Sequence, residues 1–137
     1  MREIQYTLVG LGNIGRNLLH VLAHRAEAVA TQYGVRFTLV GAADSSGAAI
    51  DPTGLDLLRL RDIKLGCGSA ATYPLVGRPG MSALEMVQSV NANLLVDASP
   101  TNLQDGQPGL DCTRHALGVG QDVVAANKAR LSWLTPS

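Results

Sequence analysis

Apolar positions along the chain follow two alternating patterns: short continuous runs, and longer stripes at helical spacing. Each continuous run predicts a buried strand, because a strand covered on both faces is apolar throughout. These runs are residues 4–9, 37–43, 94–98 and 123–126. The first stripe starts at Ile14 and predicts a helix that runs to about Tyr33 and stops at Gly34.

Capping signals mark further helices between these runs. Ser82 and Glu85 have the spacing of a capping box, which predicts a helix through about Val90. Pro108 suits the first turn of a helix that continues to Leu117, because proline lacks the amide hydrogen that such a turn leaves unpaired. A helix is therefore expected before each of the last two strands.

The middle of the chain has weaker signals. Thr53 is suited to cap a short helix over residues 55–63. Residues 64–80 are rich in glycine and proline, and within them residues 72–76 predict a short strand. Since Pro74 has no amide donor, we expect that strand at an edge of the sheet.

Strands and helices thus alternate along the chain. This order predicts a doubly wound α/β fold, in which a parallel sheet has right-handed crossovers and helices on both faces. The length of 137 residues and the apolar content of 46% suit one domain with one core. The sequence has no internal repeat, low-complexity segment or linker, so residues 1–137 are expected to form a single domain.

A glycine motif follows the first apolar run directly. Gly10, Gly12 and Gly15 have the G-x-G-x-x-G spacing, in which the glycines permit a sharp turn, a close pyrophosphate and tight helix packing. The first amides of the new helix suit a phosphate because they are unpaired and lie at the positive end of the dipole. Strand, motif and helix in register favour a dinucleotide site in a Rossmann-type sheet. Three turn glycines without a ligand are the alternative.

Polar residues also follow the second strand, at the edge where ligands of open parallel sheets bind. The carboxylate of Asp44 is suited to accept hydrogen bonds from the adenosine ribose, and it would repel a ribose phosphate. We therefore favour NAD over NADP, although Ser45, Ser46 and the amide of Gly47 could still bind a phosphate. Alternatively, Asp44 only caps the polar turn of residues 45–47.

Two further strand ends carry polar side chains. Ser99, Thr101 and Asn102 follow the third run, where hydroxyl and amide groups could orient a nicotinamide ring. An ordinary polar turn is the alternative. Lys128 follows the last run, where a lysine could polarise a carbonyl or hold a substrate carboxylate, unless it is a solvated surface residue.

Composition narrows the classes of partner. Eleven basic residues balance eleven acidic residues, and only 4% of the chain is aromatic, which argues against binding to nucleic acid or to an anionic membrane. The first residues pass straight into a strand pattern without a signal peptide, and no apolar run reaches membrane length. A cytoplasmic protein is the default expectation.

Cysteine and histidine give no firm metal or redox signal. Cys67 and Cys112 lie far apart without C-x-x-C spacing, so we expect free thiols, with Cys112 buried on a helix face. His20 and His24 share a helix face, which could bind a metal, but the H-E-x-x-H arrangement and a third ligand are lacking. A solvated face is favoured, and no metal is predicted.

Five segments, in this order, resemble the NAD(P)-binding domain of homoserine dehydrogenase. They are residues 10–16, 40–47, 97–102, 105–109 and 126–128. The resemblance covers nearly the whole chain, and the Ala-Asn-Lys segment at its end is the most specific part. It implies interconversion of L-homoserine and L-aspartate 4-semialdehyde by hydride transfer with NAD or NADP, a step in amino-acid biosynthesis from aspartate that leads to threonine and methionine.

The resemblance also implies roles for particular residues. Those implied at the pyrophosphate are Gly10, Gly12, Asn13, Ile14 and Gly15. Thr101 and Asn102 are implied on the nicotinamide side, and Lys128 near cofactor and substrate as the catalytic residue of this segment.

In that family a substrate-binding and dimerising domain follows and supplies the proton transfer, whereas this sequence ends at Ser137. We therefore expect this chain to bind nucleotide without turning over homoserine alone, and the full-length protein to be a homo-oligomer. Trp133 is apolar and near the end, which indicates contact with a part of the protein that this sequence lacks. Two alternatives stay open: the cofactor domain of a related enzyme such as aspartate dehydrogenase, and a non-catalytic nucleotide-sensing module.

Overall fold

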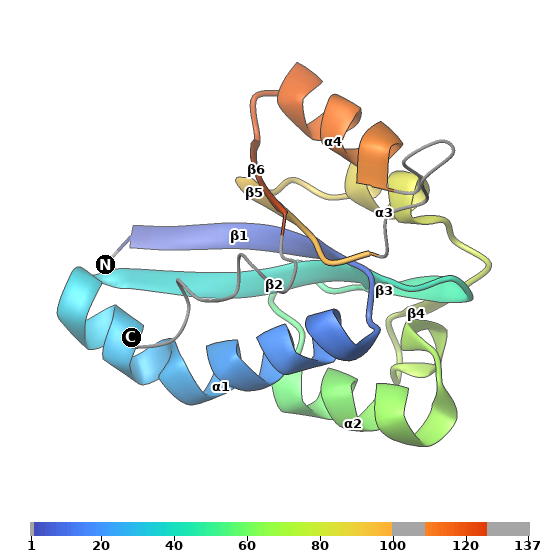
Figure 1. The fold of residues 1–137 in the computed structure, drawn as a ribbon, viewed down its shortest axis with the longest axis horizontal. Coiled ribbons are helices and arrows are strands. Elements are labelled where there is room, and N and C mark those ends of the chain that lie inside the picture. The colour runs from blue at the N-terminus through green and yellow to red at the C-terminus, as the bar shows by residue number, and fades with distance from the viewer. Residues whose placement is uncertain (1, 100–108, 126–137) are drawn as a thin grey trace.

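A computed structural model describes residues 2–99 and 109–125 and shows a sheet between two layers of helices (Figure 1). The strands of this part form one sheet in the order β4-β3-β2-β1-β5-β6. They are β1 (Arg2–Val9), β2 (Val35–Ala43), β3 (Gly47–Ile50), β4 (Gly77–Pro79), β5 (Leu94–Asp97) and β6 (Asp122–Ala125). The helices are α1 (Asn13–Tyr33), α2 (Leu57–Cys67), α3 (Ala83–Ser89), α4 (Gly109–Gly118) and the 3₁₀ turn η1 (Ala70–Thr72).

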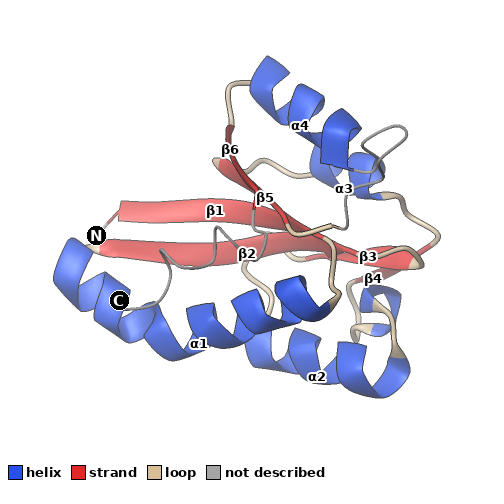
Figure 2. Ribbon diagram, viewed as in Figure 1, coloured by secondary structure: helices blue, strands red, loops and turns tan. Residues whose placement is uncertain are grey.

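The predicted doubly wound arrangement is confirmed for the four central strands. β2, β1, β5 and β6 are parallel neighbours. The chain moves from β1 to β2 in one direction along the sheet and from β5 to β6 in the other. Because both crossovers are right-handed, α1 and α4 lie on opposite faces, with α2 beside α1 and α3 beside α4 (Figure 2).

The predicted parallel sheet is wrong at one edge. β3 occupies part of the expected polar loop and pairs antiparallel with β2, and β4 pairs antiparallel with β3. The strand expected over residues 72–76 lies instead at β4, after η1. A tight turn after Asp44 reverses the chain, and a reversed strand can pair only in the antiparallel sense.

Two cores lie on the two faces of the sheet. The core under α1 and α2 includes Tyr6, Leu19 and Leu60, and the core under α3 and α4 includes Met86 and Cys112. Cys112 is buried and unpaired, as predicted, and its thiol has a pKa raised to about 11 by burial, with Asp97 and Asp111 adding to the effect. A thiol in this state is a packing residue and not a nucleophile.

Helix boundaries follow local capping chemistry. Gly34 ends α1 in the left-handed conformation, with φ of 65°, as predicted. The cap predicted for α2 is wrong, because Asp56 caps it by accepting a hydrogen bond from the Arg59 amide at 3.0 Å. Thr53 instead donates its amide to Asp51 in the preceding turn. None of the described helices combines the length and the apolar character that a membrane span requires.

The capping box of α3 is confirmed and gives a first prediction. Ser82 Oγ accepts from the Glu85 amide at 3.0 Å, and Glu85 Oε1 accepts from the Ser82 amide at 3.1 Å. Ser82→Ala is expected to lower the free energy of unfolding by about 1 kcal/mol, since it removes one acceptor from the helix start. Urea unfolding measures this, with exposed Gln88→Ala as the control on the same helix. Equal effects of the two substitutions would show that the cap contributes nothing.

Candidate dinucleotide-binding site

The carboxyl ends of three neighbouring strands meet at one edge of the sheet. β1 lies between β2 and β5, so that Val9 has Ala43 on one side and Asp97 on the other. The chain leaves β1 toward β2, whereas β5 lies on the opposite side, so the strand order reverses at β1. Ligands of open α/β sheets bind at such a reversal, beyond the carboxyl ends.

Packing explains two of the three motif glycines. Gly10 has φ of +97°, and a Cβ there would lie 2.6 Å from the amide nitrogen of Ser99. A Cβ on Gly15 would collide with the carbonyl oxygen of Gly10. Both positions therefore require glycine for the turn and for the close approach of α1 to the strand end, as the motif predicts.

Gly12 is different, because the described chain gives no reason for glycine there. Its φ of −75° is open to any residue, and a Cβ would meet no described atom within 4 Å. The space beside Gly12 is thus free in the folded chain. A cradle that a side chain would fill is what a pyrophosphate requires at this position of the motif.

The start of α1 adds hydrogen-bond donors to this space. Gly12 is the N-cap residue, and no side chain in the described part caps the helix. The amides of the first turn, which include Asn13 and Ile14, have no carbonyl partner within the helix and carry the positive end of its dipole. These donors and the free space beside Gly12 fit an anionic diphosphate.

Arg16 stabilises the glycine loop through two hydrogen bonds. The sequence analysis assigned it no role. Its guanidinium donates to the carbonyl oxygen of Leu11 at 3.1 Å and to Asn13 Oδ1 at 2.5 Å. Both contacts lie within the loop, so Arg16 holds the loop in shape and adds a positive charge beside it. The signal in the sequence is its place directly after the last motif glycine.

Asp44 accepts hydrogen bonds from four donors within the described chain. Oδ1 accepts from the amides of Ser46 and Gly47 at 2.8 and 3.0 Å. Oδ2 accepts from Lys64 Nζ at 2.9 Å and from the Ala70 amide at 2.7 Å. These four donors occupy the four acceptor positions of the carboxylate, and only 4% of the side chain is exposed. The alternative for Asp44, a cap on the polar turn, is present in the structure, and a contact of Asp44 with the ribose stays a prediction.

Lys64 was missed because it lies far along the chain from Asp44, at the end of α2. Burial would raise the pKa of Asp44, but hydrogen bonds from Ala70, Lys64 and Ser46 outweigh it and lower this pKa below 3.8. Asp44 is thus ionised at neutral pH, and its contacts with Lys64 and Ala70 join the end of β2 to the end of α2 and to η1. No local pattern in the sequence indicates such a contact.

Of the other predicted site residues, Ser45 and Ser99 are among the described residues. Ser99 lies against Gly10 and turns its hydroxyl back to Asp97 Oδ1, at 2.5 Å. Ser45 is exposed in the turn after β2. The remaining candidates, Thr101, Asn102 and Lys128, lie outside the described residues.

One histidine of the pair on α1 contacts an arginine of α2. The two rings lie 4.2 Å apart, and His20 Nδ1 is 2.8 Å from the guanidinium of Arg61. Across residues 2–99 and 109–125, no three of the side chains that ligate metals come together. Both histidines are exposed, as predicted for a solvated face, and His20 takes part in the contact between α1 and α2.

The fold and the glycine loop define a Rossmann-type α/β domain. Known proteins that resemble the chain indicate which kind of Rossmann-type domain it is. No protein-family model matches the chain. Homoserine dehydrogenase of Methanocaldococcus jannaschii is 36% identical over 125 residues, which are 91% of this chain and 37% of that protein. The NAD(+)-dependent homoserine dehydrogenase of Pseudomonas canavaninivorans is 29% identical over 133 residues, which are 96% of this chain and 38% of that protein.

Solved structures agree with these relatives. A hyperthermophilic archaeal homoserine dehydrogenase mutant in complex with NADPH has a TM-score of 0.75 at 25% identity, covering 95% of this chain and 37% of that one. The enzyme of Thermoplasma acidophilum has a TM-score of 0.72 at 28% identity, with the same coverage. The chain is a relative of the NAD(P)-binding domain of homoserine dehydrogenases. It spans little more than a third of the length of the curated relatives it matches.

Proposed function

We propose that this chain binds NAD or NADP and serves as the cofactor domain of an oxidoreductase that acts on L-homoserine. The observation that carries the proposal is the free space at Gly12, beside the uncapped start of α1. Its support is the relatedness to proteins named as homoserine dehydrogenases, one of them NAD(+)-dependent and one solved with NADPH. On this proposal, residues 1–137 are one nucleotide domain, and the substrate-binding and oligomerising parts of the whole protein lie elsewhere.

We assign the pyrophosphate to the glycine loop. The residues that would hold it are Gly10, Gly12, Asn13, Ile14 and Gly15. Backbone amides rather than side chains make this contact, and Arg16 keeps the loop in the conformation that presents them. Gly10 packs closely against Ser99, which places the loop at the end of β5 and gives the bound nucleotide a defined orientation.

We assign the nicotinamide side to Ser99, Thr101 and Asn102, which follow β5. The nicotinamide, when bound, exchanges a hydride with the carbon that carries the substrate hydroxyl. The residues of this chain orient that ring, and Lys128 places a positive charge near the developing alkoxide. The base that takes the hydroxyl proton belongs to the substrate-binding part of the whole protein.

Of the two cofactors, we propose NAD as the preferred one, and the surroundings of Asp44 give the reason. Asp44 is already bound to Lys64 and to three backbone amides. A ribose phosphate at the end of β2 would compete with this buried carboxylate for Lys64. NAD has no such phosphate and avoids that competition. Ser45, in the exposed turn, is available to the adenosine ribose of NAD and to that of NADP.

Calorimetric titration of the purified chain with NAD and with NADP tests the proposal. We expect saturable binding of both, tighter for NAD, and no homoserine-dependent rise in NADH absorbance. Tighter NADP binding would contradict the preference alone. The absence of binding by either nucleotide in a folded sample would contradict the assignment of the site. Turnover of homoserine by this chain would contradict the proposal that the substrate-binding part lies outside residues 1–137.

A further inference from the structure

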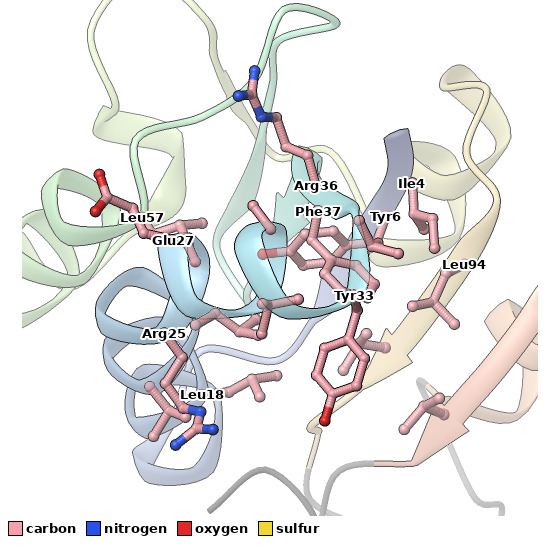
Figure 3. A pocket seen from close by; sticks show the side chains of 18 residues that line it. Ile4, Tyr6, Leu18, Arg25, Glu27, Tyr33, Arg36, Phe37, Leu57 and Leu94 are labelled. Atoms are coloured by element: carbon pink, nitrogen blue, oxygen red, sulfur yellow. The ribbon is translucent and has the colours of Figure 1, made fainter. Parts of the chain in front are cut away.

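An apolar groove beside α1 lies apart from the candidate site. Its volume is about 550 Å³, and Ile4, Phe37 and Leu94 are among the residues that line it (Figure 3). Neither the motif glycines nor Ser99 line the groove, so it is separate from the space beside Gly12. Polar groups at the strand ends are the candidates for contacts with the two nucleosides of a dinucleotide.

The end of β5 lies beside the glycine loop, on the side of β1 away from β2. Asp97, the last residue of β5, pairs with Val9, the last residue of β1. Ser99 packs on Gly10, since a Cβ added to that glycine would lie 2.6 Å from the Ser99 amide nitrogen. In Rossmann-type domains the adenosine ribose lies at the end of the second strand, so the other nucleoside extends across the reversal of strand order toward β5. Ser99 is therefore beside the path of the nicotinamide riboside.

The hydroxyl of Ser99 donates its hydrogen within the chain. Ser99 Oγ donates to Asp97 Oδ1 at 2.5 Å, and the Ser99 amide donates to the same oxygen at 3.0 Å. A carboxylate oxygen only accepts, so the direction of the hydroxyl contact is fixed. A hydroxyl has one hydrogen and two lone pairs, and the lone pairs of Oγ are what Ser99 offers to a ligand. Hydrogen bonds to a carboxylate are stronger than those between neutral groups, so this polarity persists when a ligand binds.

We propose that Asp97 fixes Ser99 as a hydrogen-bond acceptor for the nicotinamide riboside half of the cofactor, an inference that rests on the proposed binding of NAD or NADP. Two kinds of donor in that half fit this acceptor: the amino group of the nicotinamide carboxamide and the ribose hydroxyls. Ser99 is then a binding residue, and Asp97 is a positioning residue that acts through it. The same carboxylate oxygen holds the Ser99 amide, so one side chain sets both the turn after β5 and the direction of the hydroxyl.

Calorimetric titration of the full chain with four ligands tests the proposal. They are NAD, the acetylpyridine analogue of NAD, which has a methyl group in place of the carboxamide amino group, ADP-ribose, which lacks the nicotinamide, and ADP, which also lacks the second ribose. Ser99→Ala should weaken the binding of NAD by about three- to tenfold, the range for loss of one hydrogen bond, and leave the binding of ADP unchanged. A loss with NAD alone identifies the carboxamide amino group as the donor. An equal loss with NAD, the analogue and ADP-ribose identifies a ribose hydroxyl.

A double-mutant cycle tests the role of Asp97. Asp97→Ala should weaken the binding of NAD but not of ADP, and the double variant should bind NAD as Ser99→Ala does, because Asp97 acts only through Ser99. Asp97→Asn keeps an oxygen that accepts from Ser99 and should restore most of the affinity for NAD. Ser89→Ala is the matched control, because it removes an exposed serine hydroxyl that donates to the Glu85 carbonyl on α3. This control should change the affinity for none of the four ligands.

Binding of NAD by Ser99→Ala as tight as by the natural chain would overturn the proposal, and so would equal losses with NAD and ADP. A further loss of NAD affinity when Asp97→Ala is added to Ser99→Ala would overturn the positioning role of Asp97. These outcomes leave the proposed function intact. If the natural chain bound none of the four ligands, the proposed function itself would fail, and this inference would fail with it.

Discussion

Gly12→Val is expected to abolish binding of NAD and NADP while the domain stays folded. The added side chain would occupy the space that the described chain leaves free beside the start of α1. The loss should reach roughly 100-fold or more in Kd, which corresponds to about 2.7 kcal/mol of binding free energy. Because φ is −75° at this position, the cost to folding is limited to a poorer N-cap, about 1 kcal/mol or less.

Gly15→Ala is the matched control with the opposite pattern. In most helices a glycine-to-alanine change stabilises by about 1 kcal/mol, yet here the new Cβ would collide with the backbone of Gly10. We expect a loss of about 3 kcal/mol or more of unfolding free energy, because neither backbone segment can move without breaking the turn.

Two measurements on both variants separate these effects: thermal unfolding for stability, and calorimetry for nucleotide affinity. A Gly12→Val protein that binds NAD normally would disprove the placement of the pyrophosphate. If Gly12→Val unfolded as readily as Gly15→Ala, the space beside Gly12 would be needed by the protein itself and would no longer indicate a ligand.

Asp44→Asn is expected to lower the free energy of unfolding at pH 7 by about 3–5 kcal/mol, since breaking a buried ion pair leaves a charge uncompensated. The asparagine oxygen can still cap the turn to Ser46 and Gly47. Its amide nitrogen, however, would face the Lys64 ammonium and the Ala70 amide, which are both donors. Lys64, with a side chain only 14% exposed, would keep a single acceptor at the carbonyl of Gly68.

The control is Asp62→Asn. Asp62 pairs with Arg61 on the surface with 65% of its side chain exposed, so its loss should cost less than about 1 kcal/mol. Urea unfolding of the three proteins measures both values. A loss at Asp44 no larger than the loss at Asp62 would mean that the Asp44–Lys64 pair does not stabilise the fold.

The effect of Asp44 also has a defined pH dependence. Burial opposes ionisation, but the donors around Asp44 outweigh it and hold its pKa below 3.8. The contribution of ionised Asp44 to the free energy of unfolding is therefore complete above pH 3.8. It is lost as the pH falls through the lower pKa that Asp44 has in the folded state. The difference in stability between the natural chain and Asp44→Asn should shrink in acid, and a difference that grew in acid would contradict the depressed pKa.

Elements whose causes are local were predicted well. The apolar run of β1, the glycine motif and the capping box of α3 each act through neighbours a few residues away. The edge strand β3 was not predicted, and the edge strand expected over residues 72–76 lies at β4 instead, because these short segments become strands only by pairing with β2 and with each other. The contacts of Asp44 with Lys64 and Ala70 were not predicted, since both partners are distant from it in sequence.

The sequence by itself determined the alternation of strands and helices, the turn at Gly10 and the start of α1, because backbone conformation and periodicity are set by each residue and its nearest neighbours. The tertiary structure alone decided that Gly12 faces space free of described atoms and that Asp44 is bound to Lys64. Each of these depends on which surfaces come together, and close packing of distant segments is specified by the whole chain rather than by any local pattern.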